Sequence, residues 1–317
     1  MTRSRFYGGG GRIGSAPDPV VFSILKNDVN DLASKLVRRN IISGSNYSIP
    51  NPNPNVNLVL QFDNLTLMHI AAYSNASECL LFLYNVCKIS IHVNSASGYK
   101  PFHYACLGGS LECAHIIEAL YEQNENRKNE SLQDLFDFEY KNAKINLPYL
   151  AAIGGSPGIM TLIFEKGYDF ESYSPNQRQF SNQAMIHVIK TQNVECLEII
   201  LRHLRPSRSS ADKTPLMLAV INNQTEAVSL LLKSKCDPDA RTKENDTALS
   251  LACFMPNYEA VKMIAEVLVE VDIPDDIKDV AAVHWICQSR DPRIAEIILD
   301  KGIDVNRLDK DGRSGPF

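Results

Sequence analysis

The sequence predicts an all-α fold, a solenoid of stacked helix-turn-helix repeats with hairpin-like finger loops between them. Two observations predict it. A residue pattern recurs at a spacing of 33 or 34 positions, which is a period typical of repeat proteins. Each copy holds two short segments whose apolar residues form one helical stripe. Such a unit cannot bury its apolar side alone, so neighbouring copies are expected to stack and share a core.

The copies align on what we call the threonine position. Thr214 in "DKTPLMLAV" and Thr247 in "NDTALSLAC" lie 33 residues apart, and Thr66 and Lys100 occupy the same position 34 residues apart. Two weaker copies fit the same register around Asn146 and Gln183, and a further copy has Ala281 at the threonine position. The agreement among seven copies predicts one continuous array.

The motifs of these copies carry a family resemblance. Thr214-Pro215-Leu216 and Pro101-Phe102-His103-Tyr104-Ala105 match parts of a Thr-Pro-Leu-His-x-Ala signature, and Gly302-Ile303-Asp304-Val305-Asn306 matches a trailing Gly-x-Asp-Val-Asn. In these motifs the chain resembles the ankyrin-repeat family, over roughly residues 18 to 316. The resemblance implies that the histidines of the signature connect neighbouring loops by hydrogen bonds, and that a concave face contacts partners.

Local chemistry independently predicts two helices in each copy. Thr214 can cap the first helix through its hydroxyl, and Pro215 suits the first helical position, where its missing N–H is not needed. Ser156-Pro157 and Asp291-Pro292 mark helix starts in the same way. The second helix of the Thr214 copy has its apolar stripe at Ala227, Val228, Leu231 and Leu232.

The ends and one connection depart from the repeat. Residues 1–17 are expected to be a flexible Gly-rich tail, and residues 18–40 a degenerate N-terminal cap. An insert is expected at about residues 122–140, and an incomplete final repeat from about residue 309. The repeat array itself is expected to span residues 18–316.

An uncharged run at residues 146–164 has the length of a membrane span. Its centre, Gly154-Gly155-Ser156-Pro157-Gly158, is typical of a turn. The run therefore predicts two short helices, and no membrane span is expected.

Composition limits the class of protein. Hydrophobic residues make up 44% and charged residues 22% of 317 positions, so the chain can bury a large core. The net charge of -5 gives no general attraction to phosphates, and no nucleic acid partner is expected. The N-terminus lacks a secretory signal, and the eight cysteines lack a disulfide framework. A cytoplasmic protein with reduced cysteines is the prediction.

His284 and Cys287 lie three residues apart and could form a nucleophile with its base, or part of a metal site. In the repeat register, however, His284 aligns with His69 and His103, and Cys287 aligns with Cys106. A structural histidine and a buried thiol are therefore the preferred interpretation. We expect no zinc, because no four ligands recur at finger spacing.

The segment Gly9-Gly10-Gly11-Arg12-Ile13-Gly14 formally matches a dinucleotide-binding pattern, but no predicted strand precedes it and no helix follows. Metalloprotease, serine hydrolase and P-loop motifs are absent from the sequence. We therefore expect no catalytic residue and no cofactor.

The remaining candidate for function is the surface. The positions that the resemblance places on the concave face are Phe62, Tyr73, Tyr99, Phe180, Lys190, Lys243, Glu244, Phe254, Met255, Lys278 and Gln288. Tyr73, Tyr99, Phe254 and Met255 are the expected anchors, because aromatic residues and methionine are enriched at protein interfaces. The alternative is that these apolar residues fill irregular contacts between repeats.

The sequence thus predicts a non-enzymatic scaffold or adaptor that presents its concave face to a protein partner. A second hypothesis makes the chain the substrate-recruiting arm of a larger enzyme or ubiquitin-ligase complex. Neither the partner nor the oligomeric state follows from the sequence.

Overall fold

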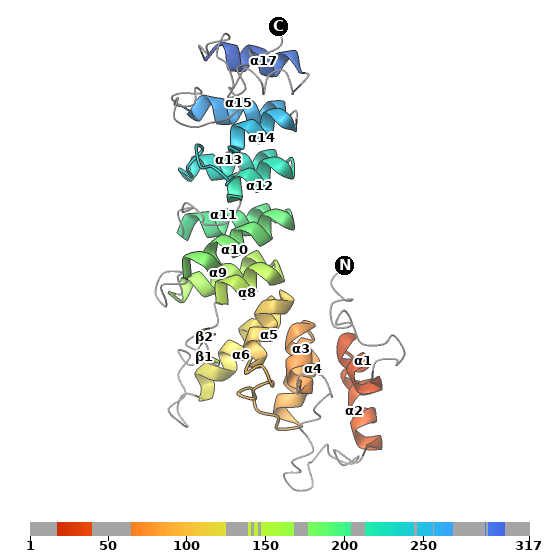
Figure 1. Ribbon diagram of the computed structural model, residues 1–317. Coiled ribbons are helices and arrows are strands. Elements are labelled where there is room, and N and C mark those ends of the chain that lie inside the picture. The colour runs from red at the N-terminus through yellow and green to blue at the C-terminus, as the bar shows by residue number, and fades with distance from the viewer. Residues whose placement is uncertain are drawn as a thin grey trace. The chain divides into compact units, whose positions relative to one another are not determined.

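The structure is a computed structural model (Figure 1). It describes residues 18–39, 65–124, 139–140, 143–144, 147–167, 177–203, 213–243, 246–255, 257–268, 289 and 291–301. The chain divides into two compact units, residues 1–105 with 112–120 and residues 106–111 with 121–317. We describe the packing of each unit by itself.

The first unit is built from helix pairs. Helix α1 packs against α3 and α2 packs against α4, so that successive pairs stack in parallel rows. The last two helices, α5 and α6, contribute residues to both units. The helices are α1 (Pro19–Leu25), α2 (Val29–Arg38), α3 (Leu67–Tyr73), α4 (Ser77–Asn85), α5 (Pro101–Gly108) and α6 (Leu111–Asn124).

The second unit continues the same plan. First helices α8, α10, α12 and α14 are consecutive neighbours in one row, and second helices α9, α11, α13, α15 and α17 form the other row (Figure 1). The helices are α8 (Leu147–Gly154), α9 (Pro157–Glu165), α10 (Gln177–Lys190), α11 (Val194–His203), α12 (Pro215–Ile221), α13 (Thr225–Lys233), α14 (Ala248–Phe254), α15 (Tyr258–Val267) and α17 (Pro292–Leu299). The prediction of an all-α array of stacked helix pairs is confirmed.

One antiparallel pair of two-residue strands precedes α8. Strand β1 (Glu139–Tyr140) pairs with β2 (Ala143–Lys144), with Glu139 opposite Lys144. The limits of the insert predicted at about residues 122–140 stay a prediction. The predicted tail at residues 1–17 and the incomplete repeat from residue 309 lie outside the described residues.

Helices α12 and α14 begin directly after the threonine position, as the sequence indicates, whereas α10 begins at Gln177, before the position predicted near Gln183. The hydroxyl of Thr214 accepts a hydrogen bond from the backbone N–H of Met217 at 3.2 Å, and that of Thr247 accepts one from Ser250 at 3.1 Å. Asp18 caps α1 in the same way, with 2.8 Å between its carboxylate and the Val20 nitrogen. Each cap pairs a backbone donor that the helix itself leaves unpaired.

Six of the described helix pairs turn at one residue with positive φ, which we call the turn position. Asparagine is the non-glycine residue that adopts the left-handed conformation most readily, since its side chain can hydrogen-bond locally. The turn position falls at the same place in successive copies, which confirms the register. Its residues are Asn27 (55°), Asn75 (55°), Gly109 (70°), Gly155 (68°), Gln192 (58°) and Asn223 (54°).

Each second helix buries one side. In α13, Ala227, Val228 and Leu231 are fully buried, as the apolar stripe predicts, while Leu232 is half-buried at its edge. The uncharged run at residues 146–164 forms α8 and α9 with a turn between them, as predicted. Within the described ranges, the structure contains no helix that is both long and apolar enough to cross a membrane.

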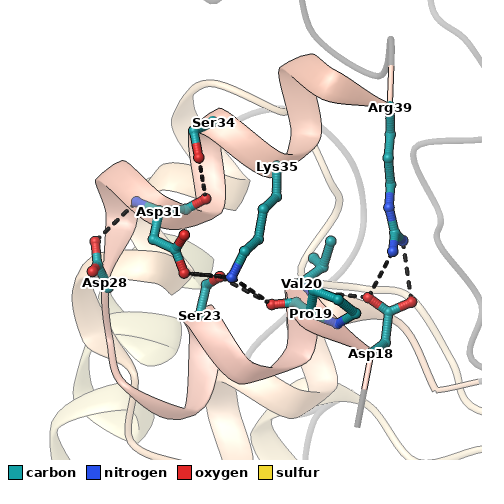
Figure 2. A network of polar contacts seen from close by, with 9 residues as sticks. All are labelled: Asp18, Pro19, Val20, Ser23, Asp28, Asp31, Ser34, Lys35 and Arg39. Atoms are coloured by element: carbon teal, nitrogen blue, oxygen red, sulfur yellow. Dashed lines mark hydrogen bonds and ion pairs between the residues drawn. The ribbon is translucent and has the colours of Figure 1, made fainter. Parts of the chain in front are cut away.

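Polar contacts hold the first helix pair together (Figure 2). Lys35 of α2 donates to the buried hydroxyl of Ser23 at 2.8 Å and to Asp31, and Ser23 donates to the same carboxylate at 2.7 Å. The hydrogen bond from Lys35 lowers the pKa of Asp31 below its usual value. Arg39 donates to both carboxylate oxygens of Asp18, at 3.1 and 3.0 Å. The role of this pair as a terminal cap stays a prediction.

The backbone of another segment lies close to the end of α8. A Cβ atom at Gly154 would lie 2.1 Å from the carbonyl oxygen of Cys106 and 2.8 Å from the nitrogen of Gly109. These are backbone atoms of the same unit and cannot move aside as a side-chain end does. Only a residue without a Cβ fits here.

We therefore predict that Gly154→Ala lowers the free energy of unfolding by about 3 kcal/mol, the upper range for overpacking. Gly167→Ala is the control: its Cβ would meet nothing within 4 Å, and the left-handed backbone alone should cost about 1 kcal/mol. Urea unfolding followed by circular dichroism measures both. Equal losses in the two variants would contradict the close approach.

Candidate interaction surface

The repeat histidine of α3 connects its helix to the next finger loop. His69 is fully buried, and its Nδ1 lies 3.1 Å from the backbone nitrogen of Thr66. Because that N–H must donate, Nδ1 is the acceptor and Nε2 carries the proton. Nε2 then donates to the carbonyl oxygens of Val93, at 3.1 Å, and Tyr99, at 3.0 Å. The predicted loop-connecting role is confirmed for this histidine.

In other copies, different side chains at this position accept a hydrogen bond from the backbone N–H at the threonine position. The backbone N–H of Lys100 donates to His103 Nδ1 at 2.9 Å, and the backbone N–H of Thr247 donates to Ser250 Oγ at 2.9 Å. In a third copy, the acceptor is the sulfur of Met217, at 3.4 Å from the nitrogen. Because imidazole, hydroxyl and thioether all serve, the position requires an acceptor and no particular reactivity.

The cysteines aligned with Cys287 are buried. Cys106 and Cys253 are both 0% exposed. Burial raises the pKa of the Cys253 thiol to about 12 and that of Cys106 higher still, so both are neutral thiols at physiological pH. His284 and Cys287 themselves lie outside the described residues. Among the described residues, no group of three or more His, Cys, Asp or Glu could hold a metal ion.

Of the surface residues chosen from the sequence, six are described with their side chains. Phe254 is 64% exposed and Met255 45% exposed at the end of α14. Lys190, the last residue of α10, and Lys243, in the finger before α14, are also exposed. For Phe180 the structure describes the backbone, within α10. The others lie outside the described residues: Phe62, Glu244, Lys278 and Gln288.

The two tyrosines are half-buried. Tyr99 packs its ring edge-on against His103, with centroids 5.8 Å apart, and against Tyr104 at 6.1 Å. Its carbonyl is also one of the acceptors of His69. Tyr99 thus packs its ring within its own copy and joins the preceding copy through its backbone, which favours the alternative interpretation for this residue. Tyr73 is the last residue of α3, and its place on the partner surface stays a prediction.

The exposed end of α14 belongs to a longer surface. Because α8, α10, α12 and α14 are consecutive neighbours, the equivalent residues near their ends follow one another along the row. We call the contribution of each helix to this surface a rung. Residues three apart share a helix face, so Leu218 and Leu251, three residues before Ile221 and Phe254, add to the same surface. All these side chains are half-buried or exposed. We call this set the first-helix stripe: Ile153, Lys190, Leu218, Ile221, Leu251 and Phe254.

The sequence reasoning missed four of these six residues. It selected aromatic, methionine, glutamine and charged side chains, so the aliphatic members were not among its choices. The repeat register holds the signal that could have found them, because Ile221 occupies the position of Phe254, and Leu218 that of Leu251.

Comparison with known proteins fits this architecture. A family profile described as "Ankyrin repeats (3 copies)" matches residues 26–130, 149–242 and 230–309. The chain belongs to the ankyrin-repeat family. The stacked helix pairs described above are thus ankyrin repeats, which are typically non-catalytic and indicate a protein–protein interaction domain.

Individual relatives are more distant. NF-kappa-B inhibitor alpha of Rattus norvegicus is 34% identical over 89 residues, which cover 27% of this chain and 28% of the relative. The Homo sapiens protein of the same name is 27% identical over 139 residues, 40% of this chain and 42% of the relative. The chain therefore matches less than half the length of these relatives.

A solved structure shows the same fold. The crystal structure of the human ASB11 ankyrin repeat domain superposes with a TM-score of 0.54 over 79% of this chain and 98% of that domain. The sequences are 17% identical, so this likeness shows the fold alone.

The buried cysteines lead to a prediction on reactivity. A thiol with a pKa of about 12, such as that of Cys253, is ionised in only about one molecule in ten thousand at about pH 8. The described cysteines should therefore react with iodoacetamide only after denaturation, as peptide mass mapping would show. Labelling of Cys253 in the native chain would contradict its burial. Selective labelling of native Cys287 would instead revive the nucleophile hypothesis for that residue.

Proposed function

We propose that this chain is a non-enzymatic scaffold or adaptor that binds a protein partner on its first-helix stripe, together with Met255. The observation that carries the proposal is the exposure of Phe254 and Met255, two large apolar side chains at consecutive positions at the end of one helix. Exposed apolar residues that adjoin one another are typical of interaction sites, whereas isolated ones are common on any surface.

The stacked arrangement suits this role physically. Each rung of the stripe is held by neighbouring helices, so its side chains need little further ordering when a partner binds. A buried apolar anchor can contribute about 2 kcal/mol or more to affinity. The stripe brings five apolar side chains together, and each is only half-buried or exposed in the free chain.

The relatives support a protein-binding role. The name NF-kappa-B inhibitor alpha describes proteins that act on another protein. The alternative hypothesis, a recruiting arm of a larger enzyme or ubiquitin-ligase complex, rests on no specific observation, because the likeness to the ASB11 domain shows only the fold. A cytoplasmic location remains part of the proposal, and neutral buried thiols are consistent with it.

Other residues remain candidates for the same surface. Lys243 is exposed in the finger loop, and Tyr73 is accessible in part at the end of α3. The other residues chosen from the sequence stay predicted members of the binding surface: Phe62, Tyr99, Phe180, Glu244, Lys278 and Gln288.

The double variant Phe254→Ser with Met255→Ser tests the proposal. We expect recovery of a partner by affinity capture with the full chain to fall about tenfold or more, since both apolar anchors are lost. Val267→Ser is the matched control, because Val267 is 48% exposed at the end of a second helix, away from the stripe. Quantitative mass spectrometry of the captured protein measures the difference.

Circular dichroism should show the same helical content in both variants. If partner recovery were equal in the double variant and in the unchanged chain, the binding surface would lie elsewhere. If Val267→Ser caused the larger loss, the second-helix face would be the binding surface.

A further inference from the structure

The first-helix stripe has a single charged rung. Lys190 is exposed at the end of α10, and within the described part of the chain no carboxylate forms an ion pair with it. The next two rungs present the apolar side chains of Ile221 and Phe254. Neighbouring positions are also without acidic residues, since the residues that follow each rung are Gly154, Thr191, Asn222 and Met255.

The rungs are evenly spaced because packed helices lie about 8–10 Å apart. Helices α10, α12 and α14 are direct neighbours, so Lys190, Ile221 and Phe254 mark three successive positions separated by two similar intervals. A polyproline II segment has three residues per turn and rises 3.1 Å per residue, so side chains three apart share one face at about 9 Å. A β-strand does not match, because residues three apart point to opposite faces.

We propose that the first-helix stripe binds an extended segment of the partner protein with a carboxylate followed, at intervals of three residues, by two apolar side chains. The carboxylate pairs with Lys190. The first apolar side chain packs on Leu218 and Ile221, and the second on Leu251 and Phe254. This inference rests on the proposed function and adds the chemistry of the partner.

The two kinds of contact have separate roles. The apolar rungs provide most of the affinity, because they lose water contact when covered. The ion pair at Lys190 lies at the surface and adds little affinity, but a like charge placed opposite it is repelled. Lys190 therefore selects the partner by charge and sets which end of the segment lies on α10.

Synthetic peptides test this directly. The probe is a proline-rich peptide with Glu, Leu and Phe at intervals of three residues, and its variants carry Gln or Lys in place of Glu. Fluorescence anisotropy with the full chain measures the Kd. We expect the order of affinity to be Glu, then Gln, then Lys, and Ile221→Ser to weaken all three peptides.

Lys190→Glu should reverse that order and weaken binding of the Glu peptide about tenfold. Lys233→Glu is the matched control, because Lys233 is likewise exposed at the last residue of a helix, in the second-helix row. It should leave all three Kd values unchanged. Restored binding of the Lys peptide to Lys190→Glu would establish the direct charge contact.

Equal affinities for the three peptides, or an unchanged order with Lys190→Glu, would overturn the inference. Tighter binding by a helical peptide with the same side chains seven residues apart would overturn the extended geometry. If no peptide binds while capture of a partner still depends on Phe254 and Met255, the inference fails and the proposed function stands. If that capture is also independent of these residues, both fail.

Discussion

The structure depends on the one-sidedness of its helix pairs. Each pair has a single apolar face, as α13 shows with Ala227, Val228 and Leu231 buried and its other side in water. A single pair would leave that face exposed, so stability comes from the contact between neighbours. The same constraint explains why a copy can lose its sequence signature, as at α8 and α10, and still pack in the row.

Polar contacts then determine how neighbours join. The turn-position residues Asn27 and Asn75 each accept a hydrogen bond from a backbone N–H at the start of the next copy's second helix, at Cys79 (3.1 Å) and Cys113 (3.3 Å). In later copies the direction is reversed, and the amide of Asn193 donates back to Gly155 at 2.9 Å. At these three junctions a side chain pairs with a backbone group of the neighbouring copy, whereas at a later junction the amide of Asn257 donates to the side chain of Asn223 at 2.8 Å.

Because the apolar faces and the polar junctions hold the stack together, the residues at the ends of the first helices are less constrained. The buried faces and turns of these helices are constrained by neighbours, whereas Lys190 and Phe254 are exposed and Ile221 is half-buried. A surface of this kind can acquire a partner without altering the fold. The repeat histidine, by contrast, helps to join neighbouring copies, since His69 accepts a hydrogen bond from Thr66 and donates one to Tyr99 inside the protein.

The sequence by itself determined the repeat register, the helix pairs and their caps, because capping residues, prolines and apolar spacing act within a few residues of one another. It also determined the structural role of the repeat histidine, through the family resemblance. Only the tertiary structure decided which apolar residues stay exposed: Tyr99 packs against its neighbours, while Ile221 and Leu251 join Phe254 on the surface. The physical reason is that exposure depends on the adjoining repeat, whose distance and orientation no local pattern contains.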